Sequence, residues 1–176
     1  MSRHLVAVIL LGFLALTIKS VLVSEFSVHL IPDAVFLLVI ISAKHLKSWT
    51  GLLVAFLLGY MTDVFSESPA GHHACLRLIS FYLTTTFYNQ FQLDRTFVFV
   101  PFVFTLSLLD SIGAWVLMNL IGMKAGLTLY GLGGLLLSAI VNAVFAPILK
   151  RAYGFLMRVF RKENRTRTVR FSADSH

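Results

Sequence analysis

Cysteine is almost absent from this chain of 176 residues, since Cys75 is the only one. A single thiol forms no internal disulfide and supplies no thiolate cluster for a metal, which excludes a disulfide-stapled fold and makes redox chemistry an unfavoured role. Charged residues are scarce as well, at 13% of the chain against 57% hydrophobic residues. The longest polar stretch, 158–176, is too short to bury a core of its own. Together these scarcities exclude a large soluble domain and indicate a protein that crosses a membrane several times.

Motifs for catalysis and cofactor binding are missing too. Ser66 and Ser68 have no histidine and acid spaced as in a known nucleophile motif, and the chain has no glycine-rich phosphate loop. His72 and His73 are adjacent, so on a helix their side chains diverge by about 100° and cannot share a metal ion as an i, i+4 pair would. We therefore expect no enzyme activity, no cofactor, no bound metal and no nucleic-acid partner.

Long apolar runs dominate what is present. The second and third runs are shorter than the roughly 20 residues that cross a bilayer core, so flanking residues lengthen them, the bilayer thins, or they form a re-entrant pair. The first run lacks a small-x-small cleavage site and is expected to remain as a helix. We predict an all-α membrane protein with a six-transmembrane-helix bundle in residues 1–157 and a basic cytoplasmic tail in 158–176. The six runs are 5–23, 30–43, 51–65, 72–91, 97–121 and 131–152.

Basic residues predict the orientation of this bundle. Six crossings leave only Lys19 and Lys124 near one side, and the positive-inside rule makes the other side cytoplasmic, with both termini there. The basic tail is expected to contact anionic lipid or a cytoplasmic partner. The cytoplasmic set comprises Arg3, Lys44, Lys47, Arg95, Lys150, Arg151 and the tail residues Arg158, Arg161, Lys162, Arg165, Arg167 and Arg170.

Charged residues inside the apolar runs need partners, because each costs roughly 2.5–3.5 kcal/mol in a bilayer span. Asp63 and Arg77 flank the turn 66–71 at similar depth, so one hypothesis is a salt bridge between them. The alternative is that Arg77 extends outward to the surface while Asp63 binds the amide groups of the turn. The sequence leaves both open because it does not fix helix rotation.

Asp110 and Asn142 lie near the middle of the last two runs, where a contact between them would satisfy both side chains. A proton or ion relay is the less favoured reading, because it needs several ionisable groups along a path. Pro147 is expected to kink the last helix ahead of its basic extension. Small residues recur every four positions at Gly51, Ala55 and Gly59, which favours close packing within the chain over a dimer face.

These features resemble the MreD family of rod shape-determining proteins. The resemblance covers most of the chain: Ile31, Pro32 and Asp33 open an apolar helix, the segment 51–74 (GLLVAFLLGYMTDVFSESPAGHHA) follows, Asp110 lies in the fifth run, and Asn142 and Pro147 precede a basic end. Its strongest part is the set Gly59, Asp63, Ser66, Pro69 and Gly71. Glu67 departs from the family pattern, where a glycine commonly follows the serine, and the pair His72 and His73 has no assigned place in it.

The resemblance implies a non-enzymatic scaffold in the bacterial inner membrane that belongs to the cell-elongation machinery. It implies association with MreC, with MreB filaments directly or through MreC, and proximity to RodZ, RodA and the elongation transpeptidase. It also implies a fold similar to the substrate-binding components of energy-coupling-factor transporters. The alternative function is a small-molecule-binding subunit of a transporter with a pocket at Asp63 and Arg77, which requires a cavity of roughly 300–1,000 Å³.

Overall fold

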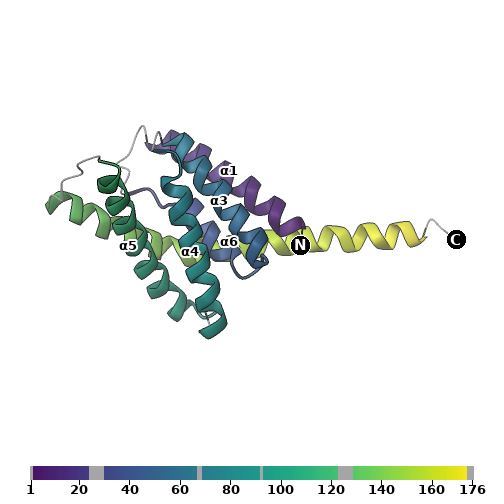
Figure 1. The fold of residues 1–176 in the computed structure, drawn as a ribbon. Coiled ribbons are helices and arrows are strands. Elements are labelled where there is room, and N and C mark those ends of the chain that lie inside the picture. The colour runs from purple at the N-terminus through teal and green to yellow at the C-terminus, as the bar shows by residue number, and fades with distance from the viewer. Residues whose placement is uncertain (1, 24–29, 67–68, 92, 123–128, 174–176) are drawn as a thin grey trace.

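Six helices make up the regular structure of the computed structural model, which describes residues 2–23, 30–66, 69–91, 93–122 and 129–173 (Figure 1). Every regular element within these ranges is an α-helix, so the predicted all-helical membrane fold is confirmed. The helices are α1 (Ser2–Val23), α2 (Ala34–Ser42), α3 (Ser48–Phe65), α4 (His72–Gln90), α5 (Thr96–Leu120) and α6 (Leu129–Ala173).

Three helices of the described chain are long and apolar enough to cross a membrane, over His4–Leu22, Thr96–Leu120 and Gly131–Arg158. The helix Trp49–Phe65 is apolar but shorter. Large apolar side chains such as Leu10, Phe97 and Val144 are exposed on the outside of the bundle, as expected for surfaces that face lipid. Glu25, Glu67 and Lys124 lie outside the described residues.

α2 forms the centre of the molecule. It begins at Ala34, four residues later than the apolar run from Leu30 suggested, and its nine residues extend only about 14 Å, less than half of a bilayer core. All its residues from Val35 to Ser42 are buried, and α1, α3, α4 and α6 pack around it. α2 is therefore a buried core helix that cannot span the bilayer by its helical length alone.

The α3–α4 hairpin packs closely because α3 carries small residues on the face toward α4. A Cβ on Gly51 would lie 1.9 Å from the ring of Phe81, and one on Gly59 would lie 2.6 Å from the Cα of Ala74. Ala55 between them is buried. The predicted role of this small-residue face in packing within the chain is confirmed for Gly51 and Gly59.

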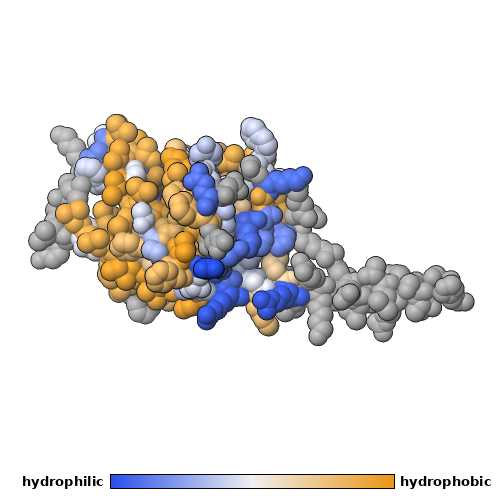
Figure 2. Space-filling model, turned by 90° about the horizontal axis from the view of Figure 1, so that it is seen from below, coloured by the Kyte–Doolittle hydropathy of each residue, from blue (hydrophilic) through white to orange (hydrophobic). Residues whose placement is uncertain are grey.

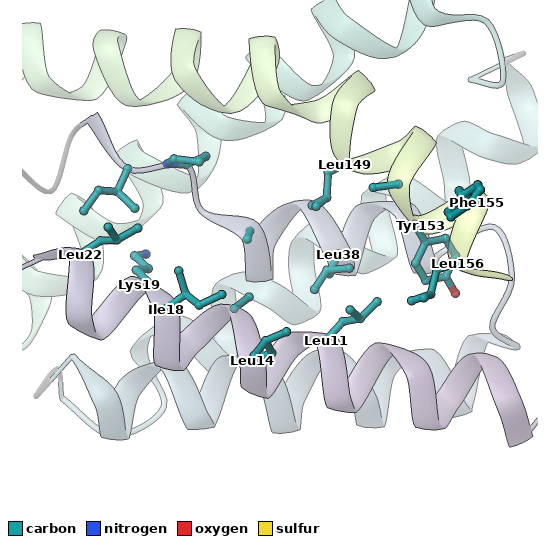
Figure 3. Close-up of a pocket in the computed structure, with 15 residues that line it drawn as sticks. Leu11, Leu14, Ile18, Lys19, Leu22, Leu38, Leu149, Tyr153, Phe155 and Leu156 are labelled. Carbon is teal, nitrogen blue, oxygen red and sulfur yellow. The ribbon is translucent and has the colours of Figure 1, made fainter. Parts of the chain in front are cut away.

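α6 is the longest helix, at 45 residues, and its C-terminal part projects well beyond the bundle (Figure 1). Pro147 lies within it, and the helix changes direction near Leu149, as expected for a proline inside a helix (Figure 3). α6 continues through residue 158, so the boundary predicted between the bundle and the tail falls inside one helix.

Polar residues gather at one end of the bundle, next to the start of the C-terminal extension (Figure 2). Lys44 pairs with Asp94, which brings the α2–α3 and α4–α5 connections together. This pairing lowers the pKa of the Asp94 carboxyl. Lys150 of α6 donates to the carbonyl oxygens of Leu93 at 2.8 Å and of Asp94 at 3.2 Å. Residues predicted to share the cytoplasmic side therefore meet at one end.

A histidine pair lies at the same end. The rings of His4 in α1 and His45 stack with their centroids 4.9 Å apart, and Nδ1 of His4 lies 3.1 Å from the hydroxyl of Tyr153 in α6. Desolvation of the ring, the neighbouring His4 and the charge of Lys44 lower the pKa of His45, opposed by Asp94. The start of α1, the α2–α3 connection and α6 are thus in contact.

Candidate functional site

Arg77 is the most deeply buried charged residue among the described side chains, with no exposed surface. Its Nη1 donates to Oδ1 of Asp110 in α5 at 2.7 Å, and its Nη2 donates to Oδ2 of Asp33 at 2.7 Å. The ring of Phe36 covers the guanidinium at 4.9 Å, while Nε has no hydrogen-bond partner among the described residues. One cation therefore bridges two carboxylates through charge-assisted hydrogen bonds, which are stronger than hydrogen bonds between neutral groups.

Asp33 performs two tasks at once. It precedes the first residue of α2, and its Oδ1 accepts a hydrogen bond from the amide of Phe36 at 3.2 Å, which caps that helix. Its Oδ2 binds Arg77 and also lies 3.4 Å from Nζ of Lys19 in α1. The helix cap and the ion pairs are thus made by the same carboxylate.

Amide and hydroxyl groups extend this polar network into the remaining helices. Oδ1 of Asn142 in α6 accepts the amide of Asp33 at 2.7 Å, and Nδ2 of Asn142 donates to the hydroxyl of Ser107 in α5 at 2.9 Å. The hydroxyl of Ser80 in α4 lies 3.4 Å from Oδ1 of Asp110. We call the set Lys19, Asp33, Arg77, Ser80, Ser107, Asp110 and Asn142 the polar network.

The polar network joins α1, α2, α4, α5 and α6 through side chains far apart in sequence. Its formal charges cancel, because Lys19 and Arg77 oppose Asp33 and Asp110. Asp33 is bonded to Arg77 and to the amide of Phe36, and Asp110 is bonded to Arg77. The chemistry of the polar network is therefore that of a structural tie between helices.

The second polar feature is the corner between α3 and α4, formed by Asp63 and the turn that ends at Gly71. The carboxylate of Asp63 accepts hydrogen bonds from the amides of Gly71 at 3.0 Å, His73 at 2.7 Å and Ala74 at 3.3 Å. These are orphan amides at the start of α4, where a negative charge is favourable. Gly71 has φ of 90°, a conformation that disfavours a Cβ.

Other residues of the corner have local roles. The hydroxyl of Ser66 donates to the carbonyl of Thr62 at 2.7 Å, and the carbonyl of Pro69 accepts the amide of His72 at 3.1 Å. Gly59 allows the backbone of α4 to approach α3. The corner is therefore held by capping and close backbone packing.

Two pairings considered from the sequence are wrong. Asp63 does not pair with Arg77, because it is occupied by the amides of α4 while Arg77 points to Asp33 and Asp110. Arg77 does not extend to the surface either, but Asp63 does bind an amide of the turn, as the alternative hypothesis had it. Asp110 and Asn142 belong to one network, yet each contacts other residues in preference to its predicted partner.

Sequence reasoning missed Lys19, Asp33, Ser80 and Ser107 as members of the site, because Lys19 was placed near one side of the membrane and Asp33 only at the opening of an apolar helix. A usable signal exists for Asp33: it lies between Pro32 and an apolar run, the position of a helix cap. Of the predicted tail residues, Arg158 is exposed, and 161–170 lie on the projecting part of α6. Among the described residues, no three histidine, cysteine or acidic side chains are placed to hold a metal ion.

Two cavities of the described chain lie away from Asp63 and Arg77. One cavity of about 460 Å³ lies between α1, α2 and α6, and another of about 350 Å³ lies between α4 and α5. Neither is lined by Asp63 or Arg77. The two charged residues that suggested a transporter pocket are therefore buried in contacts of the protein itself.

Comparison with known proteins gives a family for this chain. No curated protein and no solved structure matches the chain, so the expected similarity to energy-coupling-factor transporter components stays a prediction. The family described as rod shape-determining protein MreD matches residues 1–159, which include α1 to α5, the first part of α6 and every residue of the polar network and the corner. The chain belongs to the rod shape-determining protein MreD family.

Proposed function

We propose that this chain is a scaffold of the cell-elongation complex in the bacterial inner membrane. Membership of the MreD family gives it a role in rod shape determination, within the system that includes MreC and MreB. In the proposal, the bundle binds MreC and helps couple MreB filaments to peptidoglycan synthesis. RodZ, RodA and the elongation transpeptidase are contacted directly or through these partners.

The observation that carries the proposal is the closed polar network. A transported or bound small molecule needs polar groups that face a cavity. Here Arg77 has no exposed surface and its two carboxylate partners come from α2 and α5, so its bonds hold helices together. A network that fixes the bundle as one body suits a protein that presents a constant surface to partners.

The polar end of the bundle supports the proposed orientation. Exposed Lys44, Lys47, Arg95 and Arg151 lie in the connections and helix segments of that end, and α6 carries further basic residues away from it. The positive-inside rule then favours a cytoplasmic location for both termini. In this orientation the basic part of α6 is available to anionic lipid and to cytoplasmic partners, with no role for nucleic acid.

Copurification from native membranes tests the scaffold function. The tagged chain is extracted in mild detergent, and we expect it to recover a single-span MreC-like protein. The same chain should restore rod shape to cells that lack their own copy and have become round. As a control, Lys47→Gln removes one exposed charge outside the polar network and should preserve both the copurification and the return of rod shape.

The alternative transporter function makes a different prediction for the same sample. A binding subunit would retain a small molecule and would recover transporter ATPase components in place of an MreC-like protein. Failure to recover an MreC-like protein from membranes that contain one would refute the scaffold, whatever small molecule is found.

A further inference from the structure

An apolar groove of about 460 Å³ runs along α1 (Figure 3). One wall is α1 from Leu11 to Leu22, the opposite wall is the part of α6 that follows Pro147, and the start of α2 forms the floor. The part of α6 that follows the change in direction approaches α1, and the two helices are in contact through His4 and Tyr153. The groove is therefore a wedge between helices, closed at its Tyr153 end.

The groove has the length of a lipid chain. Its α1 wall from Leu11 to Leu22 is about 17 Å long, close to the roughly 15 Å of one leaflet of hydrocarbon. A single acyl chain is the apolar group of membranes that fits this length.

Lys19 is the only charged residue among the described residues that line the groove, and it lies near the Leu22 end (Figure 3). Its side chain is 25% exposed, and its Nζ lies 3.4 Å from Oδ2 of Asp33, an oxygen that Arg77 already binds at 2.7 Å. An ammonium has three N–H donors, so the contact with Asp33 is compatible with a second one to a phosphate oxygen. The groove thus combines an apolar channel with a cation at one end.

We propose that this groove binds one anionic glycerophospholipid, with an acyl chain between α1 and α6 and the phosphate at Lys19. The lipid belongs to the leaflet nearer to Lys19, at the opposite end of the bundle from the polar residues around Lys44. It fills the wedge that would otherwise separate the two helices. This site is separate from the basic part of α6 and does not depend on the proposed scaffold function.

Native mass spectrometry of the full chain tests the proposal. The detergent-extracted protein is mixed with equal amounts of phosphatidylglycerol and phosphatidylcholine, and retained lipid is counted. We expect one phosphatidylglycerol per chain to be retained in the groove, in addition to any lipid held by the basic part of α6. Ala152→Phe, which fills the groove from the α6 wall, should abolish its retention, whereas Val144→Phe on a lipid-exposed face of α6 outside the groove should not. Lys19→Gln should reduce the preference for phosphatidylglycerol by roughly fivefold.

Other results would overturn the proposal. Equal retention by the wild type and Ala152→Phe refutes the groove, and an unchanged lipid preference in Lys19→Gln refutes the headgroup contact. Ala152→Phe could also leave lipid retention unchanged and remove another binding partner. If it removes a copurifying single-span protein, the occupant of the groove is that protein. If it removes cross-linked pairs of this chain, the occupant is a second copy. Ala15→Phe fills the groove from the α1 wall and replaces Ala152→Phe where the latter does not give a monodisperse protein.

Discussion

Replacement of Arg77 by methionine removes the cation that joins two carboxylates inside the bundle. The formal charge of the polar network then falls from zero to −1, and Asp110 loses its strongest partner, since Ser80 at 3.4 Å is its remaining contact. Replacement of Asp110 by asparagine changes the charge to +1. Combining the two changes restores a charge of zero, with Lys19 and Asp33 still paired.

The expected loss can be estimated from these contacts. Opposite charges about 4 Å apart attract by about 4 kcal/mol at an effective dielectric constant of 20. Removal of one partner from a buried pair typically costs about 3–5 kcal/mol, because the other charge remains buried and unpaired. We expect a loss of this size for Arg77→Met. The double change with Asp110→Asn should cost about 1–3 kcal/mol less than the sum of the single changes.

Unfolding by sodium dodecyl sulfate in mixed micelles, followed by tryptophan fluorescence, provides the free energies for this cycle. A parallel cycle of Arg77→Met with Asp63→Asn is the control, because Asp63 binds amides of α4 and should show a coupling below about 0.5 kcal/mol. Additive losses for Arg77 and Asp110, or a strong coupling of Arg77 with Asp63, would refute the arrangement of the polar network.

Three further predictions concern the corner, the close packing of α3 and the histidine pair. Asp63→Ala should lower the free energy of unfolding by about 2 kcal/mol through loss of the α4 cap, and a change below 0.5 kcal/mol, on the order of noise, would contradict this. Gly59→Ala should cost about 1–3 kcal/mol, whereas Gly133→Ala, with open space around it, should be neutral or stabilising; equal effects would refute the packing argument. The pKa of His45 is lower in the folded protein than in the unfolded chain, so its contribution to the free energy of unfolding is complete above about pH 6.5 and is lost as the pH falls toward the folded pKa. Thermal unfolding measured between pH 8 and 5 should show this loss of stability toward low pH, and His45→Asn should make the loss smaller.

The sequence was sufficient to predict the helices and their approximate order, because long apolar runs have few other solutions in a membrane. The corner was predictable as well, since Asp63 stands near the end of one run and Gly71 next to the start of another. Both the helices and the corner depend on residues that are close together in the sequence. The length of α2 was less predictable, because an apolar run does not show at which of its residues the helix begins.

Partner choice within the bundle could not be predicted from the sequence. Arg77 lies 14 residues from Asp63 but 44 from Asp33 and 33 from Asp110, and depth alone favoured the nearer residue. The direction in which a side chain points depends on helix rotation, which packing decides. In the packed bundle α4 lies close to α3 at Gly59, and Arg77 points toward Asp33 and Asp110.

The short central helix gives a physical reason for the polar network. α2 begins inside the bundle, next to Arg77, so the amides at its start need hydrogen-bond partners from the protein itself. An unmet backbone group there costs several kcal/mol. Asn142 accepts the amide of Asp33, and the carboxylate of Asp33 accepts the amide of Phe36. That carboxylate in turn requires a cation, and Arg77 requires a second carboxylate for its other nitrogen. The buried charges therefore follow from starting a helix inside the bundle, and none of them has to be explained by a substrate.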